Sequence, residues 1–260
     1  MFVDAHCHLT HKSLKDQLPD VIKRAKEKGV VAVICSGVNV PTNREVLALH
    51  KKYPDFVKVS LGLYPIDLIG MEEESGLERQ VEPFDLDDEL KFIEKNKNDI
   101  LAIGECGLDY HWDKTHHDEQ KANFTKIIEF AKRINKPLIV HTRKAEADCI
   151  ELLERLGAKK VQLHMFEGRK NVIKKAAELG FCFSIPAILY KSEHFKMLVD
   201  MVPITQLLTE TDAPWMSPVM GKSNEPMYVA DTVKEIARIK KLNPEEVEKI
   251  LYLNYQRLFL

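Results

Sequence analysis

The stretch Met1-Phe2-Val3-Asp4-Ala5-His6-Cys7-His8-Leu9 opens the chain and guides the interpretation of everything that follows it. Its first three residues are apolar and suit a short buried strand that continues into a polar tip at His6 and His8. Residues two apart on a strand share a face, so we expect both imidazoles to point the same way and Cys7 to point away from them. Two imidazoles placed in this way can ligate one metal ion. The alternative is a pair of surface histidines.

Length and composition limit the class of protein. A chain of 260 residues can bury a large core, and we expect a single domain over residues 1–260. The net charge of −2 offers no global basic field to a nucleic acid or a membrane, so any polyanion must be bound locally. The five cysteines are scattered and form no Cys-x-x-Cys pair, which indicates reduced thiols, each most simply a small core residue.

The same features predict where the protein resides. Asp4 and His6 interrupt the N-terminus where a signal peptide would need an apolar segment. The longest apolar run, residues 30–35, is too short to cross a bilayer. We therefore expect a soluble, cytoplasmic protein with no membrane association, and no protein partner is evident.

Short apolar strands alternate with helical patterns along the chain. The expected strands cover residues 1–3, 30–35, 56–63, 100–103, 137–140, 160–163, 181–185 and 206–208. The expected helices cover residues 13–28, 43–52, 86–97, 118–134, 193–201, 226–240 and 244–259, with two more ending at about residues 156 and 179. Residues 66–85 are expected to form a long loop. The alternation is typical of a (β/α)8 barrel of the TIM type, although a doubly wound open sheet would give a similar pattern.

The polar residues at the strand ends favour the barrel. In a barrel the carboxyl ends of all strands meet at one face, and here five expected strands end in residue types that bind metals. Taken singly, each has an ordinary explanation, such as a core histidine or an acid at a turn. Together they suit two ions that share a bridging carboxylate, because four imidazoles and two carboxylates exceed the needs of one tetrahedral ion. The six residues are His6, His8, Glu105, His141, His164 and Asp212.

These residues lie in sequence blocks that resemble the TatD-type metal-dependent deoxyribonucleases of the amidohydrolase-like superfamily. The blocks span the chain in the family's order: Asp4-Ala5-His6-Cys7-His8-Leu9, Gly104-Glu105-Cys106-Gly107-Leu108-Asp109-Tyr110, His141-Thr142-Arg143, His164 with Phe166 and Gly168, and Glu210-Thr211-Asp212-Ala213-Pro214. The resemblance implies a barrel hydrolase with its active site at the carboxyl ends of the strands.

The resemblance also implies a ligand set. His6, His8 and Asp212 would hold one divalent ion, and His141 and His164 would hold the other. Glu105 would bridge the two ions. Nitrogen-rich ligation favours Zn, Mn, Co or Ni over Mg, whereas the family is usually described as supported by Mg. Mg, Mn and Zn are the leading candidates.

The expected reaction follows from the same resemblance. A water or hydroxide between the ions would attack the phosphorus of a DNA phosphodiester, working from the 3′ end of single strands. Glu105, Asp212 and Arg143 are the expected catalytic residues, with Asp212 as both ligand and proton acceptor.

Arg143, Tyr64 and Glu210 are the expected contacts with the substrate. Arg143 lies two residues past His141, and its planar guanidinium can grip a phosphate. Glu210 lies two residues before Asp212 and can position a group or accept a hydrogen bond from a ligand imidazole. Tyr64 stands where the family usually has the histidine of a Gly-x-His-Pro block. Its hydroxyl can donate to a phosphate oxygen but cannot carry positive charge, so we expect an altered substrate preference and rate.

Two other functions fit the sequence. One is hydrolysis of a small amide, lactone or phosphotriester, because the same barrel hosts these reactions and a fold does not determine a function. Many such relatives bridge their metals with a modified lysine, whereas the fourth strand here offers Glu105. The other is a non-catalytic, metal-carrying scaffold, against which the complete ligand set argues. The leading interpretation is a metal-dependent hydrolase of DNA phosphodiester bonds.

Overall fold

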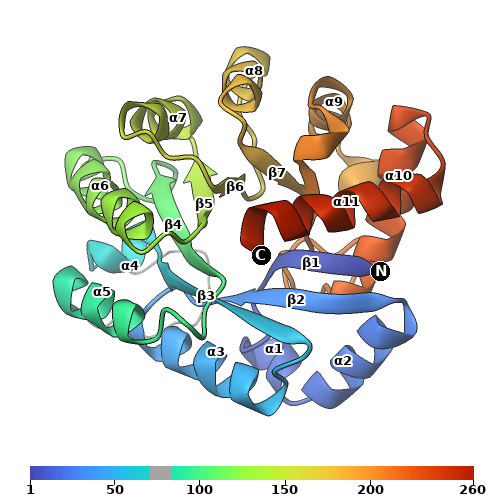
Figure 1. Cartoon of the computed structure of the whole chain (residues 1–260), viewed down its shortest axis with the longest axis horizontal. Coiled ribbons are helices and arrows are strands. Elements are labelled where there is room, and N and C mark those ends of the chain that lie inside the picture. The colour runs from blue at the N-terminus through green and yellow to red at the C-terminus, as the bar shows by residue number, and fades with distance from the viewer. Residues whose placement is uncertain (71–83) are drawn as a thin grey trace.

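The computed structural model describes residues 1–70 and 84–260. Eight parallel strands pair in chain order and curve into a nearly closed barrel with helices around its outside (Figure 1). The strands are β1 (Phe2–Cys7), β2 (Val30–Ser36), β3 (Val57–Leu63), β4 (Ala102–Asp109), β5 (Leu138–Arg143), β6 (Val161–Leu163), β7 (Cys182–Ile185) and β8 (Leu207–Thr209). The predicted (β/α)8 barrel is confirmed, because a doubly wound sheet would not keep its strands in chain order.

Most helices connect successive strands and cover the outer face of the barrel. They are α1 (Lys12–Lys15), α2 (Leu18–Glu27), α3 (Val40–Lys52), α4 (Pro65–Leu68), α5 (Leu86–Lys95), α6 (His117–Arg133), α7 (Glu146–Arg155), α8 (Lys170–Glu178), α9 (Glu193–Met201), α10 (Val229–Lys240) and α11 (Pro244–Phe259), with short 3-10 turns at Leu189–Lys191, Ile204–Gln206 and Pro226–Tyr228. Among the described residues, no helix is both long enough and apolar enough to span a membrane.

Some boundaries differ from the expectation for local reasons. The helix expected over residues 13–28 is two helices, because Pro19 begins a new helix in the first turn of α2. Helix α3 begins before Thr42, since Asn39 is its N-cap and forms a reciprocal capping box with Thr42. Part of the loop expected over residues 66–85 is helical in α4, and residues 71–83 lie outside the described residues.

Some strands, β4 and β5 among them, extend further than expected at their carboxyl ends. Glu105 lies inside β4, and both His141 and Arg143 lie inside β5. Backbone hydrogen bonds to neighbouring strands therefore hold these polar residues in place, rather than a loose loop.

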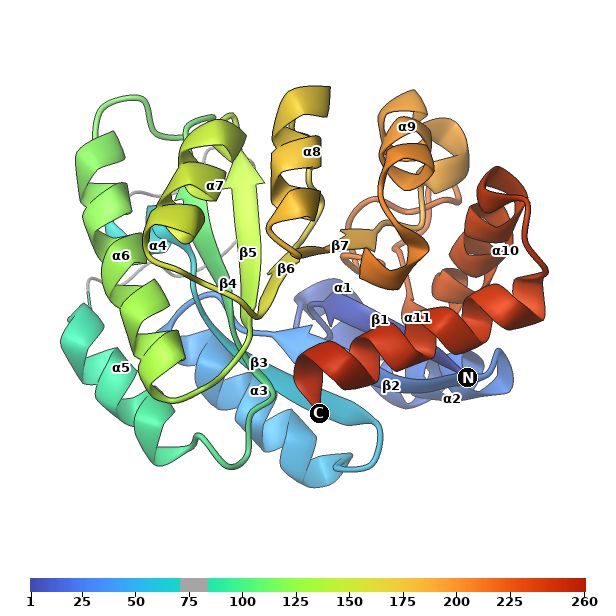
Figure 2. The ribbon, with the colours of Figure 1, turned by 45° about the horizontal axis from the view of Figure 1, so that its top comes forward.

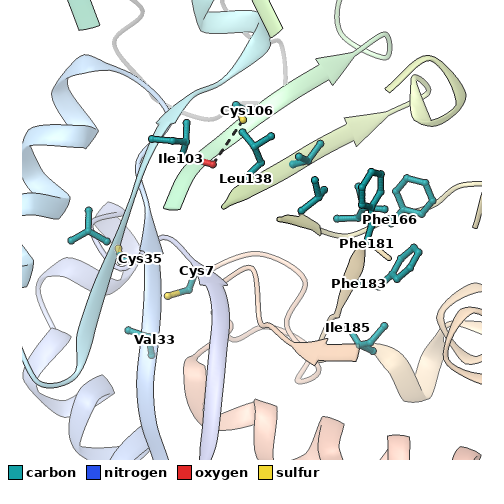
Figure 3. Close-up of a cluster of buried hydrophobic side chains, with 14 of the residues drawn as sticks. Cys7, Val33, Cys35, Ile103, Cys106, Leu138, Phe166, Phe181, Phe183 and Ile185 are labelled. Carbon is teal, nitrogen blue, oxygen red and sulfur yellow. Dashed lines mark hydrogen bonds between the residues drawn. The ribbon is translucent and has the colours of Figure 1, made fainter. Parts of the chain in front are cut away.

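Apolar side chains on the outer face of the barrel pack against the helices. Figure 3 shows part of this cluster, with Phe181 and Phe183 from the β7 region and three thiols, Cys7, Cys35 and Cys106. All five cysteines are free. Four of them are buried, which confirms the prediction that they are small core residues, whereas Cys182 is only partly buried.

A second apolar cluster fills the inside of the barrel at the amino-terminal ends of the strands. Small and medium side chains from β1, β2, β4, β5 and β8 meet Tyr255, Leu258 and Phe259 of α11. Helix α11 therefore lies across this end of the barrel, next to β1 (Figure 2). The opposite end, formed by the carboxyl ends of the strands, is left for a site.

Backbone hydrogen bonds connect the last strand region to the first. The Asp212 N–H donates to the His6 carbonyl oxygen at 3.0 Å, and the His8 N–H donates to the Ala213 carbonyl oxygen at 2.7 Å. This closure holds Asp212 beside His6 and His8, although more than 200 residues separate them along the chain.

A β-bulge in β4 turns Glu105 into the barrel. Ile103 pairs with Leu138 of β5, and Cys106 pairs with Val140. Between these two pairs β4 advances by three residues and β5 by two, so β4 contains one extra residue. A bulge reverses the alternation of faces beyond it and often re-aims a side chain next to an active site. Glu105 therefore points inward although a regular strand would turn it outward.

A second bulge has the same effect in β1. Asp4 pairs with Val33 of β2 and Cys7 pairs with Cys35, which again leaves one extra residue in the first strand. Before the bulge, the odd-numbered residues Val3 and Ala5 pack inside the barrel. Beyond the bulge the faces are exchanged, so the imidazole of His6 points into the barrel mouth.

Gly62 of β3 allows the bulged part of β4 to lie close to β2 and β3. A Cβ atom at position 62 would lie 1.9 Å from the carbonyl oxygen of Gly37 and 2.5 Å from the backbone nitrogen of Glu105. Both distances are shorter than any tolerated contact, and both atoms belong to backbone. The close approach therefore requires glycine.

We predict that Gly62→Ala destabilises the fold by about 3 kcal/mol or more, because the backbone near Glu105 must move to admit the methyl group. Chemical denaturation of the variant measures the loss. Gly180→Ala is the matched control: its Cβ meets nothing within 4 Å, and only the positive φ of 83° opposes the substitution, at roughly 1–2 kcal/mol. Equal losses in the two variants would contradict the prediction.

Candidate metal centre

The carboxyl ends of the strands surround a cavity of about 400 Å³. Its lining includes five of the six predicted metal ligands, and the sixth, His6, is fully buried beside them. The fold therefore brings the six residues together from five strand ends. The five in the lining are His8, Glu105, His141, His164 and Asp212.

His6 and His8 present their Nε2 atoms to one point. These atoms lie 3.0 Å apart, as expected for residues that share a face. Ser36 of β2 occupies the other nitrogen of each ring: its hydroxyl contacts His6 Nδ1 at 3.1 Å, and its carbonyl oxygen contacts His8 Nδ1 at 3.1 Å. A carbonyl oxygen can only accept, so His8 donates from Nδ1 and its Nε2 keeps a lone pair in the neutral ring.

Glu105 divides its two carboxylate oxygens between two pairs of imidazoles. Oε2 lies 3.4 Å from His6 Nε2 and 3.3 Å from His8 Nε2. Oε1 lies 2.9 Å from His141 Nδ1 and 3.9 Å from His164 Nε2. This is the arrangement expected of a carboxylate that bridges two cations.

His141 and His164 each have a buried carboxylate behind the imidazole. His141 Nε2 lies 3.0 Å from Asp109 Oδ2, and His164 Nδ1 lies 2.9 Å from Glu210 Oε2. Partners of this kind fix the orientation and the tautomer of a metal-binding imidazole. They leave Nδ1 of His141 and Nε2 of His164 facing Glu105.

Asp212 completes the cluster from the exit of β8. Its Oδ1 lies 3.5 Å from the Nε2 atoms of both His6 and His8, and 4.0 Å from Nε2 of His164. Its backbone has a φ of 56°, in the left-handed region that non-glycine residues rarely adopt. Such conformations gather at functional sites, where surrounding contacts hold them.

Asp4 connects the backbone of His6 to Thr211, the residue before Asp212, a role that was not predicted from the sequence. Its buried carboxylate accepts hydrogen bonds from the Thr211 N–H at 2.9 Å, from the Thr211 hydroxyl, and from the His6 N–H at 3.3 Å. Burial raises the pKa of Asp4 to about 8 despite these donors. The sequence did contain a signal for this role, because Asp4 is an acidic residue directly after the apolar start of a predicted buried strand.

Opposite charges shift the titration of the imidazoles. Burial alone would lower the pKa of each ring, but Asp212 and Glu105 outweigh it and raise the pKa of His8 to about 8. Burial would also lower the pKa of His141, but the carboxylates of Asp109 and Glu105 outweigh this effect and raise the pKa to about 9. The pKa of His6 also lies well above its ordinary value for this reason.

The carboxylates shift in the opposite direction. Burial would raise the pKa of Glu105, but hydrogen bonds from His141, His6 and His8 hold it well below its usual range. Burial is likewise outweighed at Asp212, where nearby imidazoles keep the pKa low. Both carboxylates are therefore ionised at neutral pH, and the cluster attracts cations, whether protons or metal ions.

The donor set fits divalent metal ions. Among the described residues, three groups could each hold a metal ion, because the ligand atoms within each group all lie within 4.8 Å of one another: His6, His8 and Glu105; Glu105, His141 and His164; and His6, His164 and Asp212. Glu105 belongs to two of these groups. Imidazole nitrogens combined with carboxylate oxygens suit Zn and Mn, and the carboxylates also suit Mg.

The three predicted substrate contacts lie in different places. Arg143 lines the cavity, with its guanidinium carbon 5.0 Å from the centre of the Trp112 ring. Tyr64 also lines the cavity, but its hydroxyl donates to Asp109 Oδ2 at 2.9 Å. Glu210 is fully buried behind His164 and is absent from the described residues that line the cavity, so the structure places it as a partner of the imidazole.

Comparison of the sequence with known proteins identifies the family of the chain. Residues 3–260 match the profile of the family described as TatD related DNase. The chain is 35% identical over 261 residues to deoxyribonuclease TATDN3 of Homo sapiens, covering 99% of this chain and 94% of that protein. It is 36% identical over 265 residues to YabD of Bacillus subtilis, an uncharacterized metal-dependent hydrolase, covering 100% of this chain and 99% of that protein.

Solved structures show the same fold. The crystal structure of YJJV, a TatD homologue from Escherichia coli K12, superposes with a TM-score of 0.87 at 23% identity, covering 99% of this chain and 97% of that one. The lactonase Lmo2620 of Listeria monocytogenes superposes with a TM-score of 0.66 at 13% identity, covering 100% and 94%. At these identities the likeness concerns the fold alone. The family profile and the curated relatives decide the assignment: the chain belongs to the TatD-related DNase family of metal-dependent hydrolases, which act on ester bonds.

Proposed function

We propose that the protein removes nucleotides from the 3′ end of single-stranded DNA by hydrolysing phosphodiester bonds with two divalent ions. The observation that carries the dinuclear part is the division of Glu105, whose two oxygens face two separate pairs of imidazoles. In this proposal His6, His8 and Asp212 would hold one ion, His141 and His164 would hold the other, and Glu105 would contribute one oxygen to each. Metal ions bound there would supply Lewis acidity toward the phosphate oxygens and lower the pKa of a nearby water.

The residues of the chain would perform the remaining steps. Asp212 would accept the proton of the attacking water through Oδ1, the carboxylate oxygen that faces the Nε2 atoms of His6 and His8. Arg143 would hold a phosphate oxygen pair. No carboxylate within residues 1–70 and 84–260 pairs with Arg143, and the Trp112 ring beneath it holds the guanidinium at the cavity.

The shape and charge of the site support a strand end as the substrate. The cavity has a volume of about 400 Å³, and the net charge of −2 gives the chain no overall positive field that would attract a long duplex. Trp112 and Trp215 both line the cavity, and aromatic rings stack on unpaired bases irrespective of sequence. We propose the cytoplasm as the location of this activity.

The direct test uses single-stranded DNA labelled at either end, with Mg, Mn or Zn supplied in turn to metal-stripped protein. We predict stepwise shortening from the 3′ end by the parent and a loss of rate of about 10²–10³-fold or more in Glu105→Gln, which loses charge at the bridging position. Metal analysis should show two ions per parent chain and fewer in the variant.

Glu167→Gln is the control, since Glu167 is a carboxylate of the same cavity that belongs to none of the metal-binding groups. It should keep the metal stoichiometry of the parent. Intact DNA under all three metals would reject the nuclease. Turnover confined to small esters or lactones would instead favour the small-molecule hydrolase.

Arg143→Ala should raise KM for the oligonucleotide about tenfold or more while leaving metal stoichiometry unchanged, because a charge-assisted contact with phosphate is lost. Arg143→Lys should recover part of the affinity as a point charge without the planar fork. Steady-state kinetics on a labelled oligonucleotide provide the measurement. An unchanged KM in Arg143→Ala would remove this residue from the substrate contacts.

Metal affinity should increase with pH between about 6 and 9. Without metal, His8 and His141 bind protons below pKa values of about 8 and 9, and an incoming ion must displace them, at about tenfold in affinity per pH unit for each proton released. Titration calorimetry with Mn²⁺ in two buffers of different ionisation enthalpy counts the released protons. Affinity independent of pH would show that these imidazoles are not ligands.

A further inference from the structure

We propose that Tyr64 and Asp109 act as a chain of positioning residues that orients His141 for metal binding. This inference rests on the proposed metal centre and assigns Tyr64 a role other than contact with the phosphate. The hydroxyl of Tyr64, the carboxylate of Asp109 and the imidazole of His141 follow one another at 2.9 Å and 3.0 Å.

Asp109 is anchored by the backbone that follows β4. It is fully buried, and its Oδ1 accepts hydrogen bonds from the N–H groups of His111 at 2.8 Å and Trp112 at 3.1 Å. These two bonds fix the plane of the carboxylate. Its second oxygen, Oδ2, is therefore aimed at a defined point, where Tyr64 and His141 meet it.

The carboxylate dictates which nitrogen of His141 faces the centre. An ionised carboxylate only accepts, so His141 must carry a hydrogen on Nε2 to bond with Asp109 Oδ2. The lone pair of the neutral ring is then on Nδ1, the atom that lies 2.9 Å from Glu105 Oε1. The hydrogen bonds from Tyr64 and His141 to Asp109 thus select the tautomer and the orientation that His141 needs as a metal ligand.

Tyr64 contributes the second donor to the same oxygen. Only 5% of its surface is exposed, and it packs in an apolar cluster with Val38 and Ile66. Its ring lies 4.9 Å from the imidazole of His141 at an interplanar angle of 59°, so it also supports the ring sterically. A phosphate in the cavity would meet a hydroxyl that is already engaged with a buried carboxylate.

The chain offers a matched control in the next tyrosine. The Tyr110 hydroxyl also donates to an aspartate, Asp148 Oδ2, at 3.0 Å. This pair contacts none of the predicted metal ligands. Tyr110→Phe therefore removes the same kind of hydrogen bond without disturbing the centre, and it separates a loss of stability from a loss of positioning.

The experiment compares Tyr64→Phe, Asp109→Asn and Tyr110→Phe with the parent, all stripped of metal. Calorimetric titration with Zn²⁺ measures the affinity of each binding event, and circular dichroism with thermal melting verifies that each variant is folded. Nitrogen-15 NMR of the imidazoles in the Zn²⁺-loaded proteins reports which nitrogen of His141 carries hydrogen.

We expect one of the two Zn²⁺ binding events to weaken about 10–100-fold in Asp109→Asn and about tenfold in Tyr64→Phe. Tyr110→Phe should bind like the parent. In the parent, NMR should show hydrogen on Nε2 of His141. At saturating metal, Tyr64→Phe should recover most of its kcat with an unchanged KM for DNA.

Parent-like Zn²⁺ affinity in a folded Tyr64→Phe variant would overturn the inference, and a raised KM in that variant would identify a direct phosphate contact instead. Hydrogen on Nδ1 of His141 in the loaded parent would also overturn it. Because metal affinity and imidazole signals do not depend on DNA cleavage, a parent that binds Zn²⁺ but leaves DNA intact would reject the proposed function alone.

Discussion

The carboxylate of Glu105, shared between two pairs of imidazoles, is the interaction on which the rest of the site depends. A buried carboxylate is costly unless charges and hydrogen bonds compensate it, and four imidazoles from β1, β5 and the β6 exit provide that compensation. Two features of the barrel bring Glu105 there. The bulge in β4 turns its side chain inward, and Gly62 allows the backbone of β4 to lie against its neighbours.

A second layer of buried polar residues surrounds the predicted metal ligands and holds them in place. Ser36, Asp109 and Glu210 each contact the outward nitrogen of an imidazole, so every ring has a determined orientation. Asp4 connects the backbone of His6 to Thr211, the neighbour of Asp212. A polar network of this kind tolerates burial only when its members are hydrogen-bonded, and these contacts provide the hydrogen bonds.

The division of the barrel into two ends relates the fold to its chemistry. Helix α11 packs its aromatic residues against small side chains at the amino-terminal ends of the strands and leaves the carboxyl ends open to the cavity. Stability and reactivity are therefore placed at opposite ends, as in other barrels of this type. The family comparison assigns a metal-dependent hydrolase, and Arg143 and two tryptophans are among the residues that line the cavity at the open end.

The sequence by itself determined the alternation of strands and helices and the position of the six candidate ligands near strand ends, because strand and helix periods are local patterns. It favoured the barrel, and the order of the paired strands decided for it. Only the tertiary structure decided how these residues are aimed. The bulges depend on the register between strands, and the partners of His141 and Tyr64 meet across 32 and 45 residues of chain. A tyrosine hydroxyl can serve a phosphate or a carboxylate equally well, and its packing beside Asp109, rather than its place in a motif, determines which one it contacts.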